Sequence, residues 1–79
     1  MTAVEAIKAI MKEQRVSQAK LAEKMKVYGQ QWVYNMLNAK HGVRTDSLIK
    51  AMEAMGYEVV LRNKVNDSEI VLELGEEER

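Results

Sequence analysis

The fold is decided by residues 17–38, which read SQAKLAEKMKVYGQQWVYNMLN. Ser17 is an N-cap candidate, and apolar residues then recur at helical spacing until the helix ends near Lys26. A turn follows that contains Gly29, the residue there that takes a positive φ freely. A second helix then begins at Gln30, so this stretch predicts two short helices joined by a tight turn.

The register of the second helix, at about residues 30–38, follows from which of its side chains can be buried. If the turn is one residue longer than the shortest form, Val33 and Met36 face the core and Trp32 is partly exposed. The shorter turn would bury Trp32 and point Asn35 inward. A buried asparagine without a partner is costly, so the sequence favours the longer turn.

The outer stripe of this second helix indicates a function. Two short helices and a tight turn within about twenty residues form the helix-turn-helix unit. Glutamine and asparagine pair bidentately with adenine in the major groove, and no carboxylate lies in the stripe. Glutamine and asparagine are also ordinary helix-surface residues, so the prediction of DNA binding rests on the whole arrangement. The stripe consists of Gln30, Gln31, Tyr34 and Asn35.

Two more helices flank this unit. Residues 3–14 carry apolar side chains at helical spacing, and Thr2 with Glu5 forms a candidate capping box. Another helix is expected to begin with Thr45 as its N-cap and to end at Gly56, which suits a left-handed position.

After Gly56 the period of the apolar residues changes from helical to alternating, which predicts two strands. Asn66 and Asp67 both tolerate left-handed conformations and are expected to form the tight turn. The register set by that turn pairs Lys64 with Glu69, Leu61 with Leu72, and Val59 with Leu74. The fold class expected is therefore mainly α, with four helices followed by a C-terminal β-hairpin.

The charge is distributed unevenly although its sum is zero. Residues 1–56 hold nine Lys/Arg and five Asp/Glu, which gives +4, and residues 57–79 hold three and seven, which gives −4. A basic first part suggests a polyanionic partner, although a mixed solvated surface would explain it equally well. We expect a DNA-binding domain over 1–56, and a hairpin for dimerisation with an acidic tail over 57–79.

The composition excludes several classes of protein. The chain has no cysteine and one histidine, so disulfides are excluded and neither a metal site nor a cofactor is expected. No nucleophile with a supporting triad is recognisable, so an enzyme is not expected. The longest apolar run is three residues, so no membrane span is expected and the cytoplasm is the expected location. His41 beside Lys40 fits a solvated loop better than a phosphate contact.

Residues 17–25, SQAKLAEKM, resemble the Ser-Gln-x-x-Leu-Ala-x-x-hydrophobic segment of the phage repressor and Cro-type (XRE-like) helix-turn-helix family. The resemblance extends from about Ala6 to Gly56. It implies a lambda repressor-like, sequence-specific regulator of transcription, a repressor that binds double-stranded DNA as a homodimer. Two departures are the replacement of the family's turn glycine by Lys26 and the hairpin in place of a fifth helix.

The resemblance also implies roles for individual residues. Base edges would be contacted from the outer stripe, Gln30, Gln31, Tyr34 and Asn35. Phosphates would be contacted by Gln18, Lys26, Gly29, Asn38, Lys40 and Arg44. The apolar face of the hairpin must be buried either on the side of its own helical domain or on the strands of a second subunit. The second is preferred, so a dimer interface is expected through Tyr57, Val59, Leu61, Ile70, Leu72 and Leu74.

Two other functions remain open at this point. One is an antitoxin, which would bind a toxin protein and also repress its own operon. The other is a protein-interaction module that uses the hairpin and does not bind DNA. The module predicts no salt-dependent affinity for a duplex, whereas both DNA-binding functions do.

Overall fold

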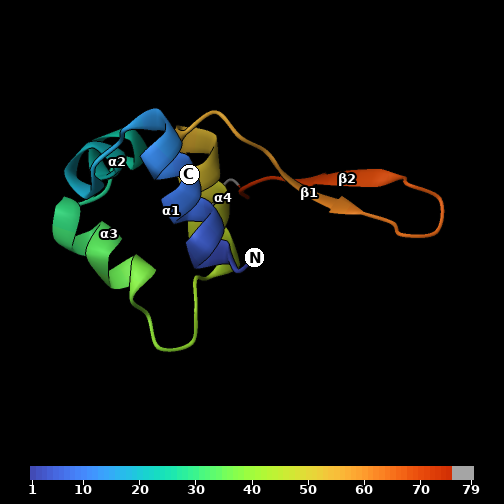
Figure 1. The fold of residues 1–79 in the computed structure, drawn as a ribbon, viewed down its shortest axis with the longest axis horizontal. Coiled ribbons are helices and arrows are strands. Elements are labelled where there is room, and N and C mark those ends of the chain that lie inside the picture. Colours follow the sequence, from blue (N-terminus) through green and yellow to red (C-terminus); the bar gives the residue numbers. More distant parts are fainter. Residues whose placement is uncertain (76–79) are drawn as a thin grey trace.

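In the computed structural model, which describes residues 1–75, four helices precede a two-stranded hairpin that projects away from them (Figure 1). The mainly helical fold class with a C-terminal hairpin is therefore confirmed. The acidic tail expected at residues 76–78 lies outside the described residues. The elements are α1 (Ala3–Gln14), α2 (Gln18–Met25), α3 (Gln30–Leu37), α4 (Thr45–Ala54), β1 (Val59–Arg62) and β2 (Glu69–Leu72).

The first helix begins with the expected capping box. The Thr2 hydroxyl accepts from the backbone N–H of Glu5 at 3.1 Å, and the Glu5 carboxylate accepts from the backbone N–H of Thr2 at 2.8 Å. These bonds from the backbone and side chain of Thr2 lower the pKa of the exposed Glu5 carboxyl.

A separate hydrogen bond joins the ends of α1 and α4. The amide of Gln14, the last residue of α1, donates to the carbonyl of Met55 at 2.8 Å.

The core lies among the four helices. Ile7, Leu21 and Val33 are completely buried, and Ala22 is a small buried residue on α2, the helix against which α3 packs. Methionines fill much of the remaining space, which suits a core without phenylalanine because their side chains adapt to irregular gaps. Among the described residues, no helix is long and apolar enough to cross a membrane.

The turn between α2 and α3 is the longer of the two turns that were compared from the sequence. Ser17 caps α2 by accepting from the backbone N–H of Lys20 at 3.1 Å. At the other end, Lys26 adopts the left-handed conformation with φ 60°, and the N–H of Val27 reaches back to the carbonyl of Ala22 at 3.1 Å. Gly29 then precedes α3 with φ 115°, a value that side chains rarely allow.

The left-handed Lys26 gives a prediction about stability. Lys26→Gly is expected to raise the free energy of unfolding by about 1 kcal/mol, because glycine takes this conformation without the steric cost of a Cβ. The matched control is Lys24→Gly in α2, where glycine should instead lower stability by about 1 kcal/mol. Urea unfolding followed by circular dichroism measures both, and a loss of stability in Lys26→Gly would contradict the assigned conformation.

The start of α4 differs from the prediction. Arg44, not Thr45, is the N-cap, because Arg44 is the extended residue whose carbonyl accepts the first helical bond, from Leu48 at 2.9 Å. Thr45 is the first helical residue and makes no capping bond. The Asp46 carboxylate stands in the first turn, where the helix dipole favours it, and accepts from the N–H of Ser47 at 2.9 Å.

The end of α4 agrees with the prediction. Gly56 has φ 85°, its N–H donates to the carbonyl of Glu53, and the N–H of Tyr57 donates to that of Met52 at 2.8 Å. This is a Schellman motif, which turns the chain out of the helix and toward β1.

The predicted register of the hairpin is wrong by two residues. The observed pairs are Val59–Leu72, Val60–Val71, Leu61–Ile70 and Arg62–Glu69. A turn on Asn66 and Asp67 alone would need a positive φ at both residues, and only Asp67 has one, at 61°. The Asn63 side chain instead accepts from the N–H of Val65 at 2.8 Å and supports a longer turn. Because the shift is two residues, each side chain keeps its predicted face.

Candidate nucleic-acid interface

The α3 helix has one buried side and one exposed side. Val33, Met36 and Leu37 are buried, Trp32 is partly buried, and Asn35 is exposed. This is the register that the longer turn predicts. The outer stripe, Gln30, Gln31, Tyr34 and Asn35, is exposed along its whole length.

Two amides of the outer stripe are held together. The Gln31 Nε2 donates to Asn35 Oδ1 at 3.0 Å, one helical turn away. This bond uses one donor of Gln31 and one acceptor position of Asn35, so the Gln31 oxygen and the Asn35 amino group still offer an acceptor and donors. The bond favours the rotamers in which the two amides lie side by side.

Asn38 caps the C-terminal end of α3. Its Nδ2 donates to the carbonyl of Tyr34 at 2.8 Å, and its backbone N–H donates to the same oxygen at 3.1 Å. The side chain of Asn38, expected to contact phosphate, therefore has a structural partner. Tyr34 itself is about half exposed, with 50% of its surface accessible.

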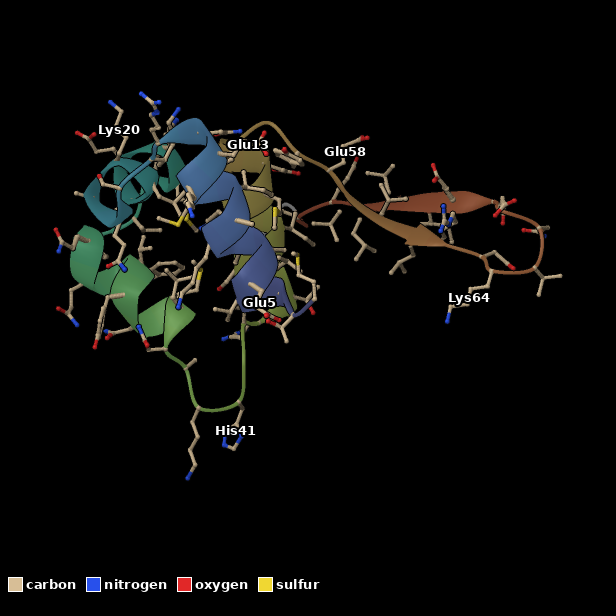
Figure 2. All side chains as sticks on the ribbon, viewed as in Figure 1. Glu5, Glu13, Lys20, His41, Glu58 and Lys64 are labelled. Carbon is tan, nitrogen blue, oxygen red and sulfur yellow. The ribbon has the colours of Figure 1, made fainter. Side chains whose placement is uncertain are left out.

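The residues expected to contact phosphate lie around α3. Lys26 is exposed before it and Lys40 after it, whereas Gln18 and Gly29 are partly buried. Arg44 is exposed, and its Nε lies 3.3 Å from Asp46 Oδ1. Figure 2 shows His41 in the loop between α3 and α4, pointing away from the helices.

The charged residues in the stretch of sequence that contains α3 are cationic, although Arg44 at its end pairs with Asp46. No Asp or Glu occurs between Glu23 and Asp46, and that interval contains four cationic residues: Lys24, Lys26, Lys40 and Arg44. The four cations are exposed. A surface of this kind attracts a polyanion and repels cations.

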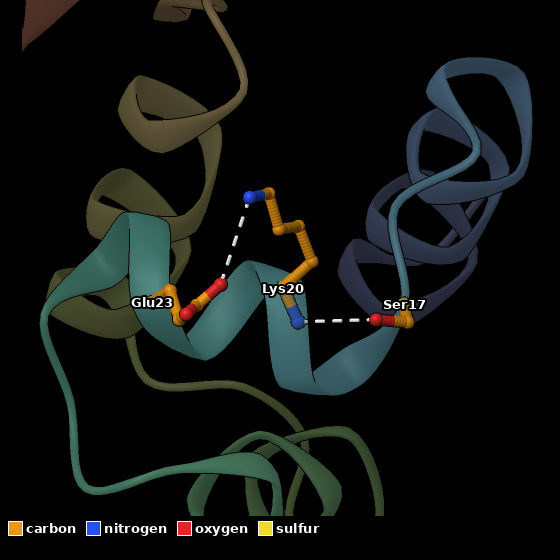
Figure 3. A network of polar contacts seen from close by, with 3 residues as sticks. All are labelled: Ser17, Lys20 and Glu23. Atoms are coloured by element: carbon orange, nitrogen blue, oxygen red, sulfur yellow. Dashed lines mark hydrogen bonds and ion pairs between the residues drawn. The ribbon is translucent and has the colours of Figure 1, made fainter.

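The outer face of α2 carries a basic and an acidic side chain that form an ion pair. Lys20 Nζ lies 3.6 Å from Glu23 Oε2, one turn along from the Ser17 cap (Figure 3). Both side chains of this ion pair are well exposed, so water and salt screen it and it adds little stability.

The sequence did not predict a hollow of about 310 Å³ beside α3. Trp32, Met36 and Val43 form much of its apolar wall, and Asn35, Arg44 and Ser47 add polar groups. It exists because the loop before α4 folds back beside α3. No local spacing signals such a contact, although Trp32 was correctly expected to be only partly buried.

The residues expected at a dimer interface differ in exposure. Leu74 is buried and Val59 packs against the helical core, so both already have contacts within the chain. Leu61 and Ile70 are 54% and 66% exposed. Tyr57 is exposed and Leu72 is half-buried. The apolar face is thus covered near the helices and open toward the hairpin tip.

Comparisons of the chain with protein-family models, with curated protein sequences and with solved structures found no match.

Proposed function

We propose that this protein is a sequence-specific, double-stranded DNA-binding regulator of transcription, a repressor of the Cro-type class that acts as a homodimer. One observation carries the proposal. The outer stripe of α3 is exposed, rich in amides and free of carboxylates, while the opposite side of the helix is anchored in the core. A helix that enters the major groove needs both properties.

The Gln31–Asn35 pair has the donor and the acceptor that would recognise adenine. Adenine presents an acceptor at N7 and a donor at its N6 amino group in the major groove. The Asn35 amino group suits N7 and the Gln31 oxygen suits N6, while the bond of 3.0 Å between the two amides holds them in place. We therefore expect at least one adenine in each half-site.

The cationic residues around α3 support contacts to the DNA backbone. Lys26 and Lys40 lie before and after the helix, an arrangement that would suit the neutralisation of phosphates on either side of the groove. Such contacts release counterions and make binding depend on salt, but they carry no sequence information themselves.

The test is selection of bound sites from random duplexes, followed by affinity measurement at several salt concentrations. The logarithm of affinity should fall against the logarithm of salt concentration with a slope of about 0.9 per phosphate contact. Lys40→Ala should weaken all duplexes alike and reduce the slope by about 0.9. Gln30→Ala should mainly reduce the preference for the selected site.

The same measurement separates the proposal from the interaction module, whereas an antitoxin is recognised only by a second measurement, of complex formation with a toxin protein. A flat salt slope, or no bound duplex at all, would overturn the proposal and favour an interaction module without DNA binding. An antitoxin would bind DNA in the same manner and would in addition form a complex with a toxin protein.

A further inference from the structure

The outer edge of β1 has unpaired backbone groups whose positions follow from the register. In the described residues, the sheet has two strands, so β1 pairs along one edge only. The N–H of Asn63 donates to the carbonyl of Ser68 at 2.8 Å, which makes this a hydrogen-bonded pair. Bonded and non-bonded pairs alternate in an antiparallel ladder, so Leu61 and Val59 also bond inward. The N–H and C=O groups of Val60 and Arg62 therefore point outward.

The side chains along this edge are self-complementary. Val60 and Arg62 lie on one face of β1, and Glu58, the residue just before the strand, continues the same alternation. If a second copy pairs antiparallel about a two-fold axis at Val60, Glu58 of each copy lies opposite the partner's Arg62. The outward backbone groups then bond to one another. An axis at Glu58 or at Arg62 would instead place like charges opposite, which is unfavourable.

The other edge of the hairpin does not have this property. From Asp67 to Glu73 the chain carries three carboxylates and no Lys or Arg. Pairing β2 with its own copy about Val71 would place Glu69 opposite the partner's Glu73, on both sides of the axis. Repulsion between these carboxylates disfavours that arrangement and selects β1 as the edge that pairs.

The exposed apolar side chains of the hairpin are also consistent with a second copy of the chain as the partner. A lone two-stranded hairpin is marginal in water, and here Leu61 and Ile70 are more than half exposed. Pairing about Val60 places Leu61 beside the partner's Val59, at the position where Val59 packs against the helical core. Each hairpin tip is then directed toward the other copy's helices.

From these observations we infer that a second copy of this chain adds to the β1 edge, with the axis at Val60, and that the dimer contains a four-stranded sheet in the order β2-β1-β1-β2. This inference rests on the homodimer of the proposed function and not on its DNA binding. An edge that is otherwise open to aggregation is covered in this way.

Single cysteines test the edge and the axis, because the natural chain has none. Val60→Cys should place the two Cα atoms about 5.5 Å apart, within the range of a disulfide. The matched control is Val71→Cys, on the same face of β2 and directly opposite Val60. In the proposed sheet its two copies are three strand spacings apart, about 14 Å, which is too far. Oxidation without DNA should therefore cross-link Val60→Cys efficiently and leave Val71→Cys as single chains.

Charge exchange gives a second readout that needs no cysteine. Glu58→Lys and Arg62→Glu should each weaken the dimer about tenfold in sedimentation, because both ion pairs become like-charged. The double variant should dimerise more strongly than either single variant, and any remaining loss reflects the like charges that Arg62→Glu places opposite Glu69 within its own hairpin. Cross-linking of Val71→Cys in preference to Val60→Cys, monomeric natural protein at tens of micromolar, or single charge variants that dimerise normally would each overturn the inference. Because these measurements contain no DNA, they succeed or fail independently of duplex binding.

Discussion

Val33→Asp is expected to lower the free energy of unfolding by at least about 3 kcal/mol. Val33 is completely buried on the inner side of α3, where it packs against the rest of the core. In the described structure no buried polar or charged side chain lies in this core, so a carboxylate there would have no partner. A chain of this length has a total stability of about 4–12 kcal/mol, so a loss of this size removes a large fraction of it and should lower the urea midpoint strongly.

The matched control is Val65→Asp. Val65 lies in the hairpin turn with 94% of its surface exposed, so the same substitution should change stability by less than about 0.5 kcal/mol. Urea unfolding followed by circular dichroism compares the two variants with the natural protein. Equal stabilities of the two variants would show that Val33 is not in the core and that the register of α3 is wrong.

Asn35→Asp is expected to reduce affinity for the selected DNA site by about 2–3 kcal/mol, which corresponds to roughly 30- to 150-fold. The carboxylate has the same shape as the amide but lacks the donors that would reach a base. It also adds a negative charge beside the phosphates. The fold should persist, because the oxygen that accepts from Gln31 is retained and the position is exposed.

Asn66→Asp is the control for net charge. The Asn66 Oδ1 accepts from the N–H of Ser68 at 3.0 Å in the hairpin turn, and a carboxylate preserves that bond. This variant has the same net charge as Asn35→Asp, but its new charge lies in the turn between β1 and β2, and Figure 1 shows that this turn is at the end of the hairpin far from α3. Its affinity should remain close to that of the natural protein. Comparable losses in both variants would mean that net charge, and not the outer stripe, governs binding.

Helices were predicted well from the sequence because their signals are local. The bounds of the first helix, the capping box at Thr2 and Glu5, and the end of α4 at Gly56 all follow from residues within a few positions of one another. The register of α3 was also predictable. A buried, unpaired Asn35 would be costly, and this cost alone selected the longer turn before α3.

The sequence alone therefore determined the helices, the turn between α2 and α3, and which side of α3 is exposed, because each depends on hydrogen bonds and burial over one or two turns. Only the tertiary structure decided the register of the hairpin, where the Asn63 side chain supports a longer turn than Asn66 and Asp67 would form. It also decided the hollow between Trp32 and Val43 and the bond from Gln14 to Met55. These features join residues that are distant in the chain or depend on how a loop closes. The energies of the hollow and of the Gln14–Met55 bond therefore appear only when the helices have packed, whereas the register of the hairpin is decided by how its turn closes.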